Sequence, residues 1–221
     1  RIDIDGAPVL VASSSLCVDD DRTACEGLVR IRYADHGDLR AETMTGFRDW
    51  LVDQVPAFSA AARRTPDAGG LNVEGLAWDP RRGALLFGVR GPVDRGIVTA
   101  LRVPVDIGTG EWSLSALGTP TIQRIFTPKR DAHQGIRDIS YDDRRDDFLI
   151  LLGRSVSADD DPFQLCRWDG AGETAALLDI TFGNTMKPEG VTAYTHRGQR
   201  RLLVVDDRGG YAVTRYPKRA Q

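Results

Sequence analysis

The stretch Val73-Glu74-Gly75-Leu76-Ala77-Trp78 places an acidic residue directly before a short apolar run that contains an aromatic side chain. Two later stretches repeat this pattern, at Arg137-Asp138-Ile139-Ser140-Tyr141 and at Pro188-Glu189-Gly190-Val191-Thr192-Ala193-Tyr194. Each of the three predicts the start of a β-strand, because short apolar runs with β-branched and aromatic residues favour strands. Their repetition predicts that the chain is built from similar structural units.

A polar turn and a second apolar run follow each of these strands, at residues 85–89, 149–152 and 202–205. Such short runs without alternation are typical of strands buried on both faces. Third strands are expected at residues 97–103, 163–168 and 211–216, and fourth strands at residues 112–117 and 174–180. The N-terminal part fits the same pattern from a second strand onward, with strands expected at residues 8–12, 28–33 and 39–44.

Four antiparallel strands in a unit of about 40–50 residues are typical of a β-propeller. We therefore predict an all-β fold, a β-propeller of four-stranded antiparallel blades, as a single domain over residues 1–221. The chain is expected to hold parts of four blades. The first would lack its innermost strand and the last its outermost one, and the N-terminal part of the ring would not be in this chain. A β-sandwich is the structural alternative.

Residues 46–64 break the strand pattern. Phe47, Trp50, Leu51 and Val55 recur at helical spacing, and Pro56 interrupts the run. We predict an inserted helix that packs on one face of the domain. Its aromatic side chains would serve core or rim packing, with partner binding as the alternative.

Acidic and basic residues are nearly balanced, with 32 Asp and Glu against 29 Lys and Arg and a formal net charge of −3. The two signs are interspersed, so no basic field is present to collect phosphate backbones. The longest apolar stretches are far shorter than the ~18 residues that span a bilayer. We expect a soluble protein with neither a nucleic-acid partner nor a membrane span. The chain begins with Arg1 and has no initiator Met or secretory signal, so its natural N-terminus is expected to lie upstream.

The three cysteines, Cys17, Cys25 and Cys166, lack the Cys/His spacing of a zinc site. Cys17 and Cys25 flank an Asp-rich turn. They would either bridge a hairpin in an oxidising compartment or remain two unlinked structural thiols.

An arginine lies sixteen residues after the acid in two of the units, Arg90 after Glu74 and Arg154 after Asp138. In the last unit Asp207 lies eighteen residues after Glu189, because its turn is two residues longer. Equal spacing predicts that each pair meets across its hairpin. Such pairs would be either ion pairs that fix the strand register or parts of a ring of charges that binds a ligand at the channel mouth.

Carboxylate oxygens suit Ca²⁺, and guanidinium groups suit phosphate or carboxylate anions. The candidate metal ligands are Glu74, Asp138, Glu189 and Asp207. The candidate residues for binding an anion are Arg90, Arg154, Arg137, Asn72 and Lys187. His133 is the histidine placed to act as a general acid or base, although loop histidines are usually just solvated.

Three stretches resemble an uncharacterised bacterial family known as domain of unknown function 3616: residues 71–77 (LNVEGLA), 86–92 (LFGVRGP) and 187–191 (KPEGV). The resemblance covers residues 70–216. It implies a propeller-like fold and no established activity. The Glu-Gly-apolar repeat is also similar, more weakly, to propeller proteins with phytase-like or esterase-like activity. This chain lacks the dense acidic clusters that a phytase-type multi-calcium site requires.

Two hypotheses about function follow. The first is a propeller that binds a small anionic ligand or a protein partner at its channel mouth. The second is a calcium-assisted hydrolase of phosphate or carboxylic esters, in which the acids hold the ion, an arginine binds the anion and metal-bound water attacks. We favour the first, because no nucleophile or base is clearly identified and a fold does not define a function.

Overall fold

A computed structural model describes residues 2–4, 6–21, 23–33, 38–108, 110–130, 132–156, 161–183 and 185–217. These residues form four antiparallel sheets. The first contains β1 (Ile2–Ile4), β2 (Ala7–Ser13), β3 (Leu28–Tyr33) and β4 (Leu39–Met44), and the second β5 (Asn72–Asp79), β6 (Ala84–Asp94), β7 (Ile97–Pro104) and β8 (Thr121–Phe126). The third contains β9 (Gln134–Asp142), β10 (Asp147–Arg154), β11 (Gln164–Trp168) and β12 (Ala176–Leu177), and the fourth β13 (Pro188–His196), β14 (Gln199–Asp206) and β15 (Tyr211–Arg215).

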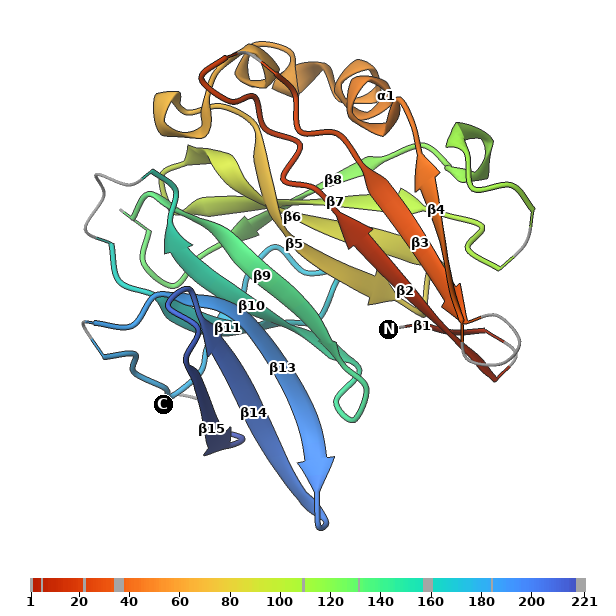
Figure 1. The fold of residues 1–221 in the computed structure, drawn as a ribbon. Coiled ribbons are helices and arrows are strands. Elements are labelled where there is room, and N and C mark those ends of the chain that lie inside the picture. Colours follow the sequence, from red (N-terminus) through yellow and green to blue (C-terminus); the bar gives the residue numbers. More distant parts are fainter. Residues whose placement is uncertain are drawn as a thin grey trace.

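The sheets follow one another in chain order around a common centre, as the blades of a propeller do (Figure 1). The first strand of each later blade is innermost, since β9 contacts both β5 and β13. The predicted all-β propeller is therefore confirmed. Glu74, Asp138 and Glu189 lie on these three innermost strands, as expected.

Glycine at the positions after two of the acids lets the chain pack closely. A Cβ atom on Gly75 would lie 2.9 Å from Cγ2 of Ile139 on the next blade, and one on Gly190 would lie 2.7 Å from Cγ2 of Val205. Both separations are shorter than real side chains tolerate, so a larger residue would push the strands apart. The glycine of the Glu-Gly-apolar pattern is therefore explained by close packing of the strands at these two positions.

Two strand predictions need correction. The first blade does have an inner strand, because β1 pairs with β2 through Ile2 and Val9. The fourth strand of the second blade is β8, not residues 112–117, which contain a short 3-10 segment at Leu114–Ala116. Trp112 is instead buried against the first blade, where its Nε1 donates a hydrogen bond to the Leu28 carbonyl (2.9 Å). Within the described residues the last blade has three strands, as predicted.

The predicted helical insertion is confirmed at α1 (Phe47–Gln54), followed by 3-10 segments at Pro56–Phe58, Ala61–Arg63 and Pro66–Ala68. Phe47 and Leu51 are fully buried, and the Phe47 ring lies 5.3 Å from that of Phe87 in β6. The helix therefore packs on the core of the first two blades. Among the described helices, none has the length and apolar character needed to cross a bilayer.

Blades two and three are linked by Arg102. Its Nε lies 3.4 Å from Oδ2 of the fully buried Asp79, and its Nη2 donates to the carbonyl of Gly170 in the third blade. The guanidinium also lies 6.0 Å from the centre of the Trp168 ring.

We predict that Arg102→Met lowers the free energy of unfolding by about 1.5–3 kcal/mol, because a buried carboxylate and a buried carbonyl each lose a charged partner. Urea denaturation measures this. The matched control is Arg124→Met, which breaks an exposed pair with Asp94 and should cost less than ~1 kcal/mol. Equal effects of the two changes would contradict a role for Arg102 in joining the blades.

Candidate functional site

Each innermost strand of the last three blades has one residue that the strand pairing skips. In β5, Val73 pairs with Val89 but Gly75 pairs with Gly88, so Glu74 has no partner in the register. The same shift skips Arg137 in β9 and Glu189 in β13. A β-bulge of this kind redirects the side chain of the extra residue. The three equivalent positions are therefore Glu74, Arg137 and Glu189.

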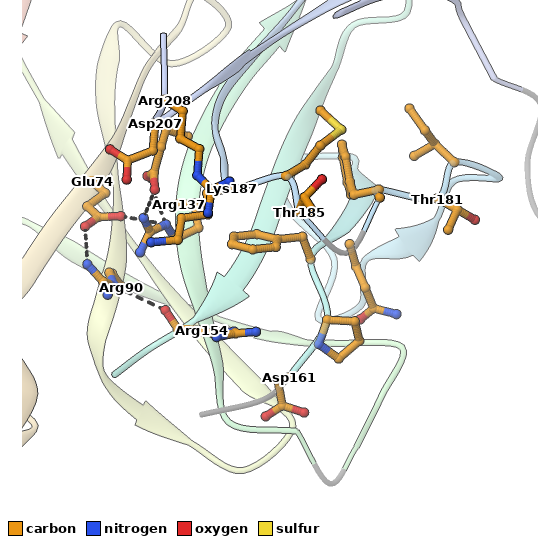
Figure 2. Close-up of a pocket in the computed structure, with 18 of the residues that line it drawn as sticks. Glu74, Arg90, Arg137, Arg154, Asp161, Thr181, Thr185, Lys187, Asp207 and Arg208 are labelled. Atoms are coloured by element: carbon orange, nitrogen blue, oxygen red, sulfur yellow. Dashed lines mark hydrogen bonds and ion pairs between the residues drawn. The ribbon is translucent and has the colours of Figure 1, made fainter. Parts of the chain in front are cut away.

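These three side chains meet at one end of the central axis. Nε of Arg137 lies 3.0 Å from Oε2 of Glu74 and 3.1 Å from Oε2 of Glu189, and its Nη2 donates to Oε1 of Glu189. Nη1 of Arg90 donates to Oε1 of Glu74 (2.7 Å), and so does Nδ2 of Asn72 (3.3 Å). We call Arg90, Glu74, Arg137 and Glu189 the interblade ion-pair chain (Figure 2).

The prediction that Asp138 meets Arg154 across the hairpin is wrong. Asp138 pairs with Leu151 in the register, and Arg154 pairs with Gln134. The bulge at Arg137 shifts the third blade by one residue relative to the sequence comparison, and such a shift turns a side chain to the opposite face of the sheet. The Glu74 and Arg90 pair is confirmed by their 2.7 Å contact.

The Asp138 carboxylate instead joins the third and fourth blades away from the ion-pair chain. Its Oδ2 accepts the N–H of Val191 in β13 (2.7 Å), and its Oδ1 accepts the N–H of Ile139 (2.8 Å). Burial raises the pKa of Asp138 to about 7, although the two backbone N–H groups oppose the shift. Asp138 lines a second cavity, on the inner strands further along the axis.

A cavity of about 1150 Å³ lies beside the interblade ion-pair chain, between the third and fourth blades. One wall is charged (Figure 2). It contains all four residues of the interblade ion-pair chain together with Arg154, Lys187, Asp207 and Arg208. The rest of the lining includes Thr181 and Thr185 and a group of apolar residues that we call the apolar wall: Phe163, Leu177, Ile180, Phe182 and Met186. The cavity therefore offers both charged groups and apolar surface.

The charged wall is held by the turn that follows β14. The backbone N–H of Lys187 donates to Oδ2 of Asp206 (2.6 Å), and the N–H of Asp207 donates to the Lys187 carbonyl (3.0 Å). Burial raises the pKa of Glu189, and the negative charges of Glu74 and Asp207 add to the rise, while Arg137 opposes it. The ionised form of Glu189 is therefore disfavoured by burial and by the two neighbouring carboxylates. A nearby cation such as Arg137 stabilises that ionised form.

His133 lies outside the lining of this cavity. Its backbone N–H donates to Oδ2 of Asp161 (2.7 Å), and its Nε2 accepts a hydrogen bond from Nε of Arg95 (3.2 Å). Asp161 does line the cavity and forms an ion pair with Lys129 (3.0 Å). His133 therefore contacts a residue of the cavity lining through its backbone N–H, and its imidazole accepts a hydrogen bond from Arg95.

The candidate metal ligands do not converge as a set. Glu74, Glu189 and Asp207 line the large cavity, whereas Asp138 faces the second one. In the part of the chain that the structure describes, no three His, Cys, Asp or Glu side chains form a metal-binding group. Calcium binding therefore stays a prediction, with Glu74, Glu189 and Asp207 as the candidate carboxylates that share one cavity.

The sequence reasoning missed Arg208, Asp161 and the apolar wall. Arg208 directly follows the predicted Asp207, so the same strand end signals it. Leu177 ends β12, and Asp161 and the other apolar residues lie on loops around β11 and β12. The position of these loops depends on how the third blade packs against the fourth. The spacing of residues within one blade carries no signal of that packing.

Fold and site together define the protein as a β-propeller with a charged cavity at one end of its central axis. The chain belongs to the family described as "Protein of unknown function (DUF3616)", which matches it over residues 64–219. The match covers the last three blades, including the whole interblade ion-pair chain. Comparisons with curated proteins and with solved structures gave no match.

We predict that the stability contributed by Asp138 falls as the pH rises from about 4 to about 7. The folded protein keeps this carboxyl protonated up to about pH 7, whereas the unfolded chain releases the proton near pH 4. Asp138→Asn removes this loss, since an amide does not ionise. The melting temperature of Asp138→Asn, measured relative to the wild type, should therefore be higher at pH 8 than at pH 4. A difference independent of pH would contradict the raised pKa.

We also predict that Arg137→Met lowers the free energy of unfolding by about 3–5 kcal/mol at pH 8. The Arg137 side chain is 10% exposed, and its loss leaves the partly buried Glu189 carboxylate without its guanidinium partner, while Glu74 keeps only Arg90 as a cation. Burial raises the pKa of Glu189, so this carboxylate is protonated more readily at pH 4, and the penalty should shrink there. Urea denaturation at the two pH values measures the change, with Arg124→Met as the control for loss of an exposed arginine.

Proposed function

We propose that the large cavity binds a small organic anion that has an apolar portion. The proposal rests on the charge balance of the cavity wall. The two arginines and two glutamates of the interblade ion-pair chain neutralise one another and add no net charge. Asp161 is also neutralised, by Lys129. Arg154 has interactions of its own and is left out of the count. The remaining acid on the wall is then Asp207, against the basic residues Lys187 and Arg208. The surplus is positive, which favours an anion.

Lys187 and Arg208 are the groups best placed to contact it. Both line the cavity, and within the described residues neither charged group has a carboxylate within 4.0 Å, while Asp206 attracts both at longer range. A guanidinium and an ammonium group together suit a carboxylate or a phosphate group. Figure 2 shows both side chains on the same side of the cavity as Arg137.

The apolar wall supports the second part of the proposal. Phe163, Ile180, Phe182 and Met186 line the same cavity as the charged groups. Binding sites for small molecules commonly combine apolar walls with a few polar groups that fix the orientation. A fully hydrated anion such as inorganic phosphate gains nothing from that wall, whereas a carboxylate with an alkyl or aryl group does.

The alternative, a calcium-assisted hydrolase, is supported by one observation. The charge of Asp207 helps to raise the pKa of Glu189, and a divalent cation between the two carboxylates would relieve that repulsion. A rise in melting temperature with added Ca²⁺ that disappears in Asp207→Asn would support this alternative. Melting that does not respond to Ca²⁺ would leave the anion site alone.

We predict that octanoate binds to the purified chain more tightly than octanol or octylammonium, as measured by isothermal titration calorimetry. Arg208→Met and Lys187→Met should each weaken octanoate binding about tenfold, because each removes one charged contact worth about 1.5 kcal/mol. Arg124→Met, on the outer strand β8, should leave binding unchanged. Equal binding of octanoate and octylammonium would contradict the proposal. Binding of inorganic phosphate as tightly as octanoate would contradict the role of the apolar wall.

A further inference from the structure

Cys17 and Cys25 face each other across the connection between β2 and β3. The backbone forms an isolated antiparallel bridge between Val18 and Ala24, which places the two cysteines opposite each other in the same register. The N–H of Cys25 donates to the carbonyl of Cys17 (2.8 Å). The two Sγ atoms are 3.6 Å apart, and both residues are partly exposed.

This geometry is close to that of a disulfide. A disulfide requires two Cβ atoms about 3.5–4.5 Å apart and an S–S bond of about 2.05 Å. The two sulfur atoms would need to approach by about 1.5 Å, which rotation of the side chains supplies. The paired backbone holds the two cysteines on facing positions, so the hairpin itself need not open.

We propose that Cys17 and Cys25 are a reversible thiol pair that closes to a disulfide when it meets a small-molecule disulfide oxidant such as oxidised glutathione. One protein thiolate attacks the oxidant, forms a mixed disulfide and releases one glutathione thiolate. The second protein thiolate then attacks the protein sulfur of the mixed disulfide and displaces the other glutathione. Two protein thiols lose two electrons and two protons, and the oxidant becomes two thiols.

The surroundings of the pair determine how its reactivity depends on pH. The Ser15 hydroxyl lies 3.0 Å from Sγ of Cys17. The hydrogen bond that it shares with Cys17, and partial burial, raise the pKa of the Cys25 thiol above its ordinary value. The reaction requires a thiolate, so the disulfide should form faster as the pH is raised. Cys166 is fully buried and its pKa is raised to about 12, so it serves as an unreactive internal reference.

The hairpin that carries the pair is attached to the second blade close to the interblade ion-pair chain. The N–H of Val73, next to Glu74, donates to the Ser15 carbonyl (2.7 Å). Leu16 is fully buried, and Nε of Arg48 in α1 donates to its carbonyl (3.0 Å). A disulfide between Cys17 and Cys25 would therefore restrain the segment that anchors the start of β5.

The test is peptide mapping of the 221-residue chain after incubation with oxidised or reduced glutathione, acid quenching and alkylation of free thiols. Trypsin cleaves after Arg1, Arg22 and Arg30, so Cys17 and Cys25 lie on separate peptides, residues 2–22 and 23–30. We expect these peptides to be joined after oxidation and separated again by dithiothreitol. Cys166 should remain alkylatable after unfolding in both samples.

Cys166→Ala should leave the joined peptides in place, whereas Cys17→Ser and Cys25→Ser should abolish them. The oxidised wild type should melt about 5–10 °C above the reduced wild type, since the link restricts the unfolded chain. Cys17→Ser should show no such shift. The proposal is overturned if Cys17 and Cys25 accumulate as separate glutathione adducts, if they stay reduced, or if the oxidised protein melts lower than the reduced one.

Discussion

The Arg137 guanidinium lies between the carboxylates of Glu74 and Glu189, and through it three neighbouring blades share one charged contact. Each of these side chains sits on a bulge of an innermost strand, where the pairing with the second strand skips it. The bulges turn the three side chains toward the axis, and Gly75 and Gly190 leave room for the strands to approach. The cavity wall beside them is therefore fixed by the same constraint that joins the blades.

Under the proposed function, the charges on the cavity wall divide into those that join the blades and those that would contact the ligand. Two arginines and two glutamates neutralise one another within the interblade ion-pair chain, so they hold the shape of the cavity mouth. Lys187 and Arg208 remain on the same wall, and the lining of the cavity also includes Phe163 and Phe182. A binding site for an organic anion requires both features, because charge alone would hold only loosely a ligand that prefers water.

The strand order was predictable from the sequence because each unit repeats an acid, a short apolar run, a polar turn and a second buried run. The Glu74 and Arg90 contact was predictable for the same reason, since hairpin spacing determines which residues face each other. The position of the Asp138 side chain was not predictable. The sequence shows an acid at this position, but it does not show that the bulge lies one residue earlier, at Arg137, so that Asp138 is out of register with Glu74 and Glu189. The fourth strand of the second blade was predicted at the wrong place because the apolar residues around Trp112 were read as a strand. Trp112 is apolar because it packs against the first blade. Contacts between blades leave no periodic signal, and most of the cavity is made by them.

A double-mutant cycle on Arg137 and Glu189, measured by urea denaturation at pH 8, tests the central claim most directly. Arg137→Met, Glu189→Gln and the double variant are compared with the wild type. If one guanidinium joins the third and fourth blades, the two single effects should be non-additive, with a coupling of about 1.5–3 kcal/mol. Additive effects within about 0.5 kcal/mol would mean that the two side chains do not interact across the blades, and the account would be wrong.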